Sequence, residues 1–477
     1  MKLAEHYLFE SRGKKFVLLP DAMQVHCVDP QDFRFIESLS DLAGCDDVVD
    51  DSDCLGRYGL KSIEDGSVLE AVTGTVSISK IAIFVAQDCN LNCTYCYGAE
   101  DGSSVGGTYG SRGKMALTTA ISSVDWLLKN SGDRENVGIV FFGGEPLLNF
   151  PLMKEIVEYA DKKADAVGKT MTYSITTNGS LLDAEKIEFL RKNRVNVTVS
   201  MDGGKRIQDS QRPLPGGGGS YDLVATKVKE LLKVIPDADC RGTIINDADV
   251  EEAEKDLRDI GFKKIHLTVA SKSLIRDDAS KYGDPTGEDT RFHHTAETIR
   301  SEALKLVNAI RAKDVDLVNQ AIMHTAWGKK LSRYSEQFIN RRKTHFPCGA
   351  GRHYVGVSAS GEIFPCHRFV GANDTKLGSV FNDDIDRSAY HKTTVHHDNP
   401  NSCSTCFAKY VCSGGCHHDN MGFSGDIHGP DPQMCDAIRV IVQEAAAIAA
   451  ELSDEDRDFM RKSGFYQEYV CPLDIFA

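Results

Sequence analysis

The sequence predicts an α/β fold built around a parallel β-sheet. Short apolar runs typical of buried strands recur at Ile81–Ala86, Val137–Phe142, Tyr173–Thr177, Val195–Met201, Arg241–Ile245 and Ile265–Val269. Segments with helical apolar spacing separate these runs, at Leu117–Leu128 and near 151–166, 183–193, 221–234 and 249–260. Six strand–helix units in succession indicate a parallel sheet, either doubly wound or forming an incomplete barrel. In both arrangements, ligands bind at the carboxyl ends of the strands.

The two flanks of this region have different patterns. At the amino end, a turn at Ser11–Gly13 separates two strand-like runs, which predicts a hairpin followed by a third strand and a helix. The expected elements are His6–Glu10, Lys15–Leu19, Gln24–Val28 and a helix near Asp32–Leu42. We expect a small α+β module with an available sheet edge. Residues 296–335 have a helical pattern, whereas Asp46–Asp53, Gly98–Gly113 and Gly216–Gly219 are expected to be loops.

Composition narrows the possible partners. The 477 residues include 55 Lys and Arg against 70 Asp and Glu, a net charge of −15. This charge argues against a nucleic-acid or anionic-membrane partner. The apolar runs are too short to span a bilayer, and the opening residues lack the pattern of a signal peptide. We therefore expect a cytoplasmic protein.

The 15 cysteines are too sparse for a disulfide scaffold, so their spacing decides their use. Three form the pattern C-x3-C-x2-C at Cys89, Cys93 and Cys96, directly after the first predicted strand. Seven lie in the carboxyl-terminal third: Cys348, Cys366, Cys403, Cys406, Cys412, Cys416 and Cys435. The other five are expected to be small buried side chains: Cys27, Cys45, Cys54, Cys240 and Cys471.

The first cysteine group has the spacing of a metal centre. Two short spacings in one loop allow three thiolates to converge, but no fourth Cys or His lies nearby in the sequence. Structural zinc sites usually have four protein ligands. A cubane cluster held by three cysteines instead leaves one iron open to an outside ligand. The alternative is a zinc loop completed by a distant residue.

An aromatic residue, Tyr95, precedes the third cysteine, and Phe142-Gly-Gly-Glu-Pro146 ends the second predicted strand. Together with the cysteine spacing, these residues resemble the radical S-adenosylmethionine (SAM) superfamily. The resemblance implies a [4Fe–4S] cluster that chelates SAM and generates a 5′-deoxyadenosyl radical. It also implies cofactor contacts from Tyr95, from the backbone of Gly143, Gly144 and Pro146, and from Glu145. Further contacts are implied for Thr177, Asn178, Ser200, Asp202 and Arg212, for which a purely structural role is the alternative.

The seven later cysteines resemble a second pattern, that of the SPASM domain, because Gly361 lies between Cys348 and Cys366 at the family's spacing. The resemblance implies two auxiliary [4Fe–4S] clusters, and hence three clusters in all. Cys403, Cys406, Cys412 and Cys435 would hold one cluster completely. Cys348, Cys366 and Cys416 would hold the other with three ligands. Its open iron would bind a substrate thiolate, or else a distant protein ligand or water.

The string Pro365-Cys-His-Arg-Phe-Val-Gly371 resembles maturases that form thioether bridges in ribosomally made peptides. These are the six-cysteine peptide maturases and the quinohemoprotein amine dehydrogenase maturation proteins. Gly107–Gly110, Gly113–Met115 and the opening strands also resemble that branch. Anaerobic sulfatase maturases carry an aspartate where this chain has His367, which argues against that activity.

The resemblance implies an incomplete (β/α)6 TIM-like barrel, a small α+β amino-terminal module and a SPASM domain. The expected division is 1–78 for leader recognition, 79–295 for the radical SAM partial barrel, 296–345 for bridging helices, 346–452 for SPASM and 453–477 for a carboxyl-terminal tail. The module would bind the leader of a precursor peptide or protein by adding it to a sheet edge.

The implied reaction joins a cysteine sulfur of the precursor to one of its carbons. Formation of this bond leaves one electron, and the auxiliary clusters offer a route out for it. A reduced protein such as flavodoxin or ferredoxin would be the electron donor. His367 or Asp202 would act as the general base, or His367 would only tune the cluster through a hydrogen bond. The alternatives are other radical–SPASM peptide modifications (epimerisation, carbon–carbon crosslinking or formylglycine formation) and a non-catalytic zinc or iron–sulfur protein.

Overall fold

The computed structural model describes residues 4–40, 53–60, 76–96, 98, 113–246, 249–269, 295–323, 325, 327–382, 384–392 and 403–466. Most of the acidic stretch expected to be a loop (46–53), most of the glycine cluster at Gly98–Gly113, Cys45 and Cys471 lie outside the described residues.

A mostly parallel sheet of nine strands forms the centre of the molecule, in the order β12-β11-β10-β4-β5-β6-β7-β8-β9. Six of these strands follow one another along the chain: β4 (Lys80–Ala86), β5 (Asn136–Gly143), β6 (Thr170–Thr177), β7 (Asn196–Ser200), β8 (Asp239–Ile244) and β9 (Lys264–Val269). Each pairs in parallel with the next. The parallel sheet predicted from the apolar runs is confirmed.

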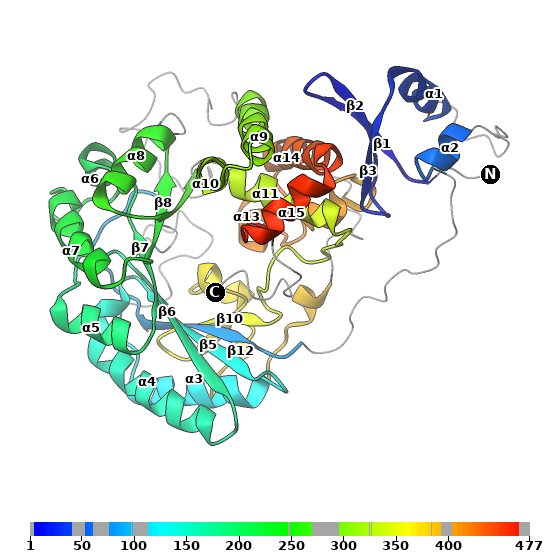
Figure 1. Ribbon diagram of the computed structural model, residues 1–477. Helices are drawn as coiled ribbons and strands as arrows, with labels where there is room; N and C mark the ends of the chain where they lie inside the picture. Colours follow the sequence, from blue (N-terminus) through cyan, green and yellow to red (C-terminus); the bar gives the residue numbers. More distant parts are fainter. Residues whose placement is uncertain are drawn as a thin grey trace.

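The helices that connect these strands lie along one side of the sheet (Figure 1). They are α3 (Leu117–Asn130), α4 (Phe150–Asp165), α5 (Ala184–Lys192), α6 (Lys205–Gln211), α7 (Tyr221–Val234) and α8 (Val250–Ile260). One hydrophobic core joins alternate strand residues, such as Ile139 and Val199, to helix residues such as Val124 and Ile156. We call this helix-covered side the outer face of the sheet and the opposite side its inner face. Each strand pairs with the next strand along the chain, and crossovers between parallel strands have the same hand. The connecting helices therefore lie on the same face of the sheet.

Three short strands from the carboxyl-terminal third extend the sheet beyond β4. They are β10 (Tyr354–Val357), β11 (Glu362–Phe364) and β12 (Gly378–Ser379). Strand β10 pairs in parallel with β4, with Tyr354 opposite Lys80, and β11 and β12 continue antiparallel. These strands are not predictable from the sequence, because runs of two to four residues are too short for a periodic pattern.

A bundle of helices packs beside the sheet and forms a second core. It contains α9 (Thr295–Arg311), α10 (Val315–Met323), α11 (Gly328–Ile339), α14 (Pro432–Glu451) and α15 (Asp454–Lys462). The first three confirm the helical pattern predicted for 296–335. Residues 453–466, which the sequence analysis assigns to a tail, contain α15 with a capping box at Ser453, and Met460 and Tyr466 are buried in this core.

The remaining elements are short. They are α12 (Lys409–Cys412), α13 (His417–Ser424) and the 3-10 helices Pro146–Asn149, His367–Phe369, Asn373–Thr375, Ser388–His391 and Cys403–Thr405. Among the described residues, none of the helices combines the length and the apolar character needed to cross a membrane.

The amino-terminal module contains the predicted three-stranded antiparallel sheet, with the order β1-β2-β3. Its elements are β1 (Tyr7–Ser11), β2 (Lys14–Leu19), β3 (Gln24–Val28), α1 (Pro30–Ser40) and α2 (Asp53–Arg57). Asp29 caps α1, since its Oδ1 accepts hydrogen bonds from the backbone N–H groups of Gln31 and Asp32 at 2.9 and 3.0 Å. The helix therefore begins two residues before the predicted Asp32.

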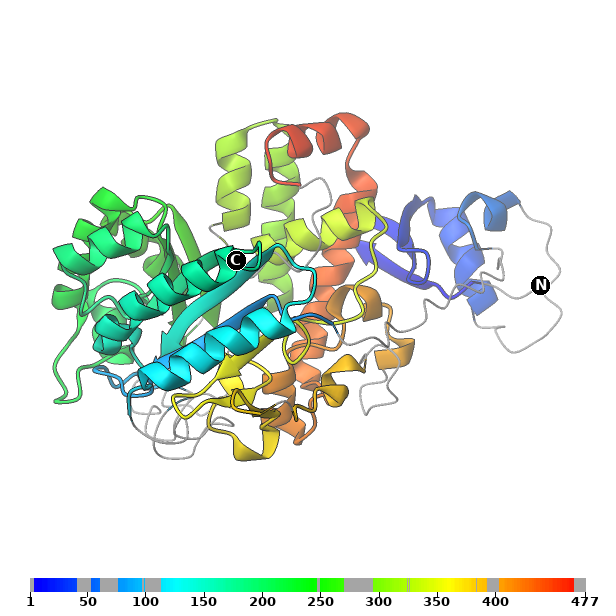
Figure 2. The same ribbon diagram turned by 90° about the horizontal axis from the view of Figure 1, so that it is seen from below.

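The module is docked on the carboxyl-terminal third of the chain (Figures 1 and 2). Ser11 donates to the buried carboxylate of Glu444 on α14, and Arg12 pairs with both Glu444 and Glu451. The ring of Tyr7 stacks on that of Phe407 with 3.9 Å between ring centroids. Residues of β1, β2 and the following turn belong to the same core as α14. The module therefore shares its core with the rest of the chain.

Lys409 connects the module to the segment that carries the later cysteines. Its ammonium lies 2.8 Å from Glu5 and 3.3 Å from Asp21, and the side chain is only 7% exposed. We expect Lys409→Met to loosen this contact, by roughly 1.5–3 kcal/mol for a buried charged hydrogen bond. Hydrogen exchange of the β1–β3 amides in the cluster-loaded chain should become about tenfold faster or more.

The matched control is Lys15→Met, since Lys15 pairs with Glu10 inside the module. Faster exchange in the control alone, or equal exchange in both variants, would show that Lys409 does not hold the module in place.

Candidate active site

The first cysteine group lies in the loop that follows β4. The loop is held on two sides by backbone hydrogen bonds. Asp88 O accepts from Glu145 N at 2.9 Å, and Ala86 O accepts from Gly144 N at 3.0 Å. On the other side, Asn92 N donates to Pro213 O at 2.8 Å and Thr94 N to Gln211 O at 3.0 Å. Cys89, Cys93 and Cys96 therefore lie at the carboxyl end of β4, where ligands bind in such sheets.

The two glycines before Glu145 are required by a close approach of backbone to backbone. Gly143 has φ +135°, and a Cβ there would lie 1.9 Å from Ala86 O. A Cβ on Gly144 would lie 2.3 Å from Asp88 O and 2.8 Å from Cys89 N. Only glycine permits both contacts. This segment thus positions the cysteine loop directly, in addition to the SAM contact that the resemblance implies for it.

Glu145 joins the ends of β5 and β6. Its fully buried carboxylate accepts hydrogen bonds from Leu147 N at 3.0 Å, Thr177 Oγ1 at 2.8 Å and Asn178 N at 2.7 Å. Burial raises its pKa to about 7 despite these donors. Both oxygens of Glu145 therefore have partners within the chain, and its expected contact with a methionine amino group stays a prediction. Pro146 begins the 3-10 helix that follows.

Asn178 connects this network to the cysteine loop. Its amide nitrogen donates to Asn90 Oδ1 at 2.9 Å and lies 3.8 Å from Cys89 Sγ, while its Oδ1 accepts from Ser180. The predicted pair Thr177 and Asn178 is thus next to the first cysteine group. Asn90 and Ser180 are additional residues of the site that the sequence analysis does not single out.

Asp202, after the carboxyl end of β7, forms a buried ion pair with Arg212. The guanidinium Nη2 donates to Oδ1 at 3.0 Å, and Nε lies 2.9 Å from Oδ2 within the ion pair. Tyr95 Oη donates to Asp202 Oδ2 at 2.6 Å, and Arg212 Nη1 lies 3.8 Å from Cys93 Sγ. Three of the predicted residues are therefore brought together beside the cysteines. Ser200 lies at the end of β7, two residues before Asp202.

Asp202 is unsuited to act as a general base in this arrangement. Its side chain is fully buried, and its oxygens also accept from Gln211 Nε2 at 2.9 Å and Thr243 N at 2.8 Å. Because donors within the chain occupy both carboxylate oxygens, neither oxygen is directed toward a substrate proton. The geometry thus favours a positioning role for Asp202.

Gln208 and Gln211 of α6 also belong to the site, although the sequence analysis does not find them. Gln208 Oε1 accepts from Asp202 N, and Gln211 bridges Asp202 to the backbone of Thr243 and Ile245 on and after β8. Both side chains are buried. A glutamine on a short helix has no distinctive spacing, so only the fold could reveal these contacts.

The later cysteines separate into two groups in space. Cys348, Cys366 and Cys416 lie together, with Arg368 Nη1 3.4 Å from Cys416 Sγ and Arg368 Nη2 2.7 Å from Asp419 Oδ1. Burial and the neighbouring cations lower the pKa of His367 to about 3. The imidazole packs on Phe142 at the end of β5, with ring centroids 4.7 Å apart, and its Nδ1 lies 2.8 Å from Tyr354 Oη. This group therefore lies on the inner face of the sheet.

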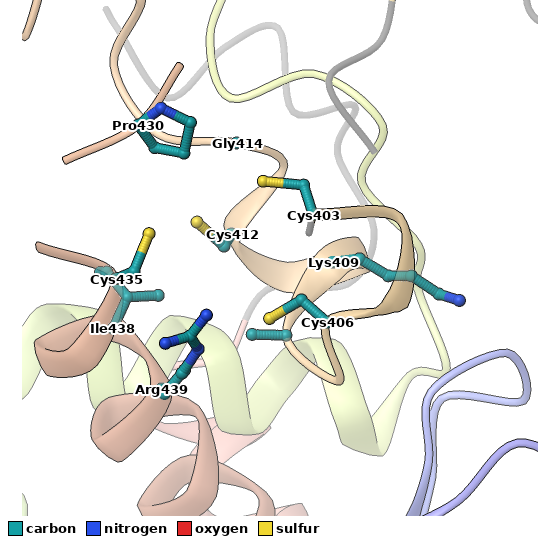
Figure 3. A pocket seen from close by; sticks show the side chains of 10 residues that line it. Cys403, Cys406, Lys409, Cys412, Gly414, Pro430, Cys435, Ile438 and Arg439 are labelled. Atoms are coloured by element: carbon teal, nitrogen blue, oxygen red, sulfur yellow. The ribbon is translucent and has the colours of Figure 1, made fainter. Parts of the chain in front are cut away.

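The other four cysteines, Cys403, Cys406, Cys412 and Cys435, line one pocket. Figure 3 shows their sulfur atoms directed into it, together with the guanidinium of Arg439. Lys409, which contacts the amino-terminal module, belongs to the same lining. The structure thus brings together the two sets that the SPASM resemblance implies, four cysteines in one and three in the other.

These donor sets fit iron–sulfur clusters, because the side chains that each set brings together for this role are cysteines. Thiolates are the preferred ligands of such clusters. Within the described part of the chain, no group of three or more Cys, His, Asp or Glu side chains is arranged to hold a single metal ion.

Comparison with known proteins agrees with this geometry. Residues 83–260 match the family model of the radical SAM superfamily. This range begins in β4, ends with α8, and includes the first cysteine group, Gly143–Pro146 and the Asp202–Arg212 pair. Residues 83–260 are therefore similar to radical SAM domains, a family that implies a [4Fe–4S] cluster and SAM.

The similar proteins include anaerobic sulfatase-maturating enzymes. A cysteine-type enzyme of Clostridium novyi is 29% identical over 32% of this chain and 40% of its own length. A serine-type enzyme of Bacteroides thetaiotaomicron is 24% identical over 71% of this chain and 82% of its own length. The chain spans less than half the length of the first curated relatives that it matches. The structure of native anSMEcpe with bound AdoMet matches with a TM-score of 0.60 and 17% identity, over 77% of this chain and 96% of the other.

Proposed function

We propose that this protein is a radical SAM maturase that forms thioether crosslinks in a ribosomally made precursor peptide or protein. The observation that carries this proposal is the presence of two three-cysteine groups on one sheet. One group follows β4 and consists of Cys89, Cys93 and Cys96. The other lies at the inner face of the sheet and consists of Cys348, Cys366 and Cys416. Each leaves room for one non-protein ligand, which suits SAM at the first and a substrate thiolate at the second.

The chain's own residues would bind and orient the reactants. When bound at the first group, a [4Fe–4S] cluster with SAM supplies a 5′-deoxyadenosyl radical that removes a hydrogen atom from the substrate. Arg212, held by Asp202 and Tyr95, places a cation beside Cys93 for the SAM carboxylate. Asn178 and the Gly143–Gly144 backbone border the same space. The parallel strands β4–β9 would correspond to the incomplete (β/α)6 barrel expected for this chemistry.

The partners follow from the same assignment. The three-stranded sheet of residues 7–28 would add the leader as a further strand. Cys403, Cys406, Cys412 and Cys435 would hold a cluster, which would supply a route for electrons between the site and a protein partner such as flavodoxin or ferredoxin. These assignments are supported by the arrangement of the cysteines and by the docking of the module beside them.

The test uses variants of the two auxiliary groups in the anaerobically reconstituted full chain. The first step is to search the DNA beside the gene for a small cysteine-containing reading frame, whose peptide then serves as the test substrate. Cys366→Ala should lose about four iron atoms per chain and all thioether product, but still release 5′-deoxyadenosine. The product of the unmodified enzyme should weigh two hydrogen atoms less per bridge, with one fewer alkylatable thiol. Cys240→Ala, at a buried cysteine outside all three groups, is the matched control.

Two results would contradict the proposal. A product that keeps every thiol would exclude thioether formation, and a chain that releases no 5′-deoxyadenosine would exclude radical chemistry altogether. The second candidate is formylglycine formation, which the similarity to sulfatase-maturating enzymes favours. It would appear as an aldehyde that reacts with hydrazide probes, without a crosslink.

A further inference from the structure

The cysteine group on the inner face of the sheet has an arginine in contact with one of its sulfur atoms. This group consists of Cys348, Cys366 and Cys416, and we call it the inner cysteine group. Arg368 Nη1 donates a hydrogen bond to Cys416 Sγ at 3.4 Å. The other terminal nitrogen, Nη2, lies 2.7 Å from Asp419 Oδ1. The carboxylate therefore orients the guanidinium toward the sulfur.

Both sides of this contact are held in place by local structure. Arg368 lies in the 3-10 helix that directly follows Cys366. The next residue, Phe369, is fully buried and anchors this helix in a small core. Cys416 is the N-cap residue of α13, so its sulfur also lies near the positive end of the helix dipole. The position of the guanidinium beside the sulfur is thus a fixed feature of the fold.

Arg368 is less exposed to water than the arginine beside the four-cysteine group. Its side chain is 19% exposed, against 36% for Arg439, which lines the pocket of those four cysteines and pairs with the exposed Asp436. A charge that is shielded from water and salt acts more strongly on its neighbours. An arginine side chain also keeps its charge at every pH at which proteins are folded. Arg368 should therefore influence its cysteine group more strongly than Arg439 does.

We propose that Arg368 raises the reduction potential of the cluster held by the inner cysteine group, and so prepares this group to take up the electron that thioether formation leaves. Hydrogen bonds to the sulfur atoms and the net charge are among the factors that set the potential of an iron–sulfur cluster. A donated N–H and a positive charge both stabilise an additional electron. This inference rests on the proposed function, because it assigns the electron to the crosslinking reaction.

The electron count of the proposed reaction requires such an acceptor. The substrate carbon radical contributes one electron and the lone pair of the thiolate sulfur contributes two, whereas the new carbon–sulfur bond holds two. One electron therefore remains when the carbon and the sulfur are joined. The joined atoms are oxidised, and the inner cysteine group with its cluster would receive that electron before it passes to a protein partner. Arg368 would act on this step through Cys416, without contact with the reacting carbon.

The experiment is an anaerobic redox titration of the cluster-loaded full chain, followed by electron paramagnetic resonance. The signal that Cys366→Ala lacks identifies the cluster of the inner cysteine group. Arg368→Met should lower the equilibrium constant for reduction of this cluster about tenfold, which is a potential lower by ~59 mV for one electron. Arg368→Gln keeps an N–H donor without the charge and should lower the potential less. Arg368→Lys keeps the charge and should stay closest to the unaltered chain.

The matched control is Arg191→Met, which removes an exposed arginine that pairs with Glu188 on α5 and should leave all potentials unchanged. An unchanged potential in Arg368→Met with full iron content would overturn the inference, as would equal potentials of Arg368→Gln and Arg368→Lys. Loss of about four iron atoms from all three variants would also overturn it, because Arg368 would then only hold the cluster in place.

The same measurements separate this inference from the proposed function. If the potential shifts as expected but the unaltered chain forms no thioether, only the proposed function fails. If the thioether forms but the potential of the inner cysteine group does not depend on Arg368, only this inference fails.

Discussion

Gly144→Ala should remove the first cluster while leaving the other two in place. The new Cβ would lie 2.3 Å from Asp88 O and 2.8 Å from Cys89 N, distances that real Cβ atoms do not adopt. Because these neighbouring atoms belong to the backbone, they cannot rotate away as a side chain could. The cysteine loop therefore has to move away from β5. The variant should retain about eight of twelve iron atoms, at about four per cubane. Release of 5′-deoxyadenosine should fall by roughly 10- to 100-fold or more, as for other positions that support metal ligands.

The matched control is Gly216→Ala. A Cβ at Gly216 meets no atom within 4 Å, and this glycine lies in an exposed turn. The control should keep its full iron content and activity. Iron analysis separates the expected result from general unfolding, because an unfolded chain would lose all clusters. A Gly144→Ala chain with full iron content and normal 5′-deoxyadenosine release would show that the close approach of the two segments is not needed.

Asp202→Asn should strongly destabilise the protein, because it leaves the Arg212 guanidinium buried without a counter-charge. Removing one partner of a buried ion pair typically costs about 3–5 kcal/mol. The arginine side chain is only 9% exposed, and Asp202 also accepts from Tyr95, Gln211 and Thr243. We expect this loss in urea unfolding of the cluster-loaded chain, together with weaker SAM binding.

The double variant Asp202→Asn with Arg212→Met tests the cause. If the unpaired charge is responsible, the double variant should be more stable than Asp202→Asn alone, although SAM binding stays weak. The exposed pair Arg206–Glu252 provides the control, since Glu252→Gln should cost less than about 1 kcal/mol. Additive losses in the double variant would show that the two side chains do not act as a pair.

The sequence was sufficient to predict the elements that are long and periodic. Strands β4–β9 lie where the apolar runs recur, and α3, α4, α7 and α8 lie where the helical spacing does. The cysteine groups could be found because each pattern is compact along the chain. The same holds for Gly143–Pro146, whose position at the end of β5 follows from the strand before it.

Other parts of the site depend on contacts between segments far apart in the sequence. The hydrogen bond between Thr177 and Glu145 depends on the register of the strands, and the one between Gln211 and Asp202 depends on the position of α6. Two of the expected domains share structure with other parts of the chain. Strand β10 of the expected SPASM domain pairs with β4 of the main sheet, and the amino-terminal module packs into the same hydrophobic core as α14.

The pairing of β10 with β4 has a consequence for how a substrate moves. Strand β4 leads directly into Cys89, and β11, which pairs with β10, leads directly into Cys366. Cys89 and Cys366 are therefore attached to strands of one hydrogen-bonded sheet, which restricts changes in the distance between them. In the proposed reaction, the peptide would therefore have to span this gap or slide across it, which would limit the spacing between the residues that become linked.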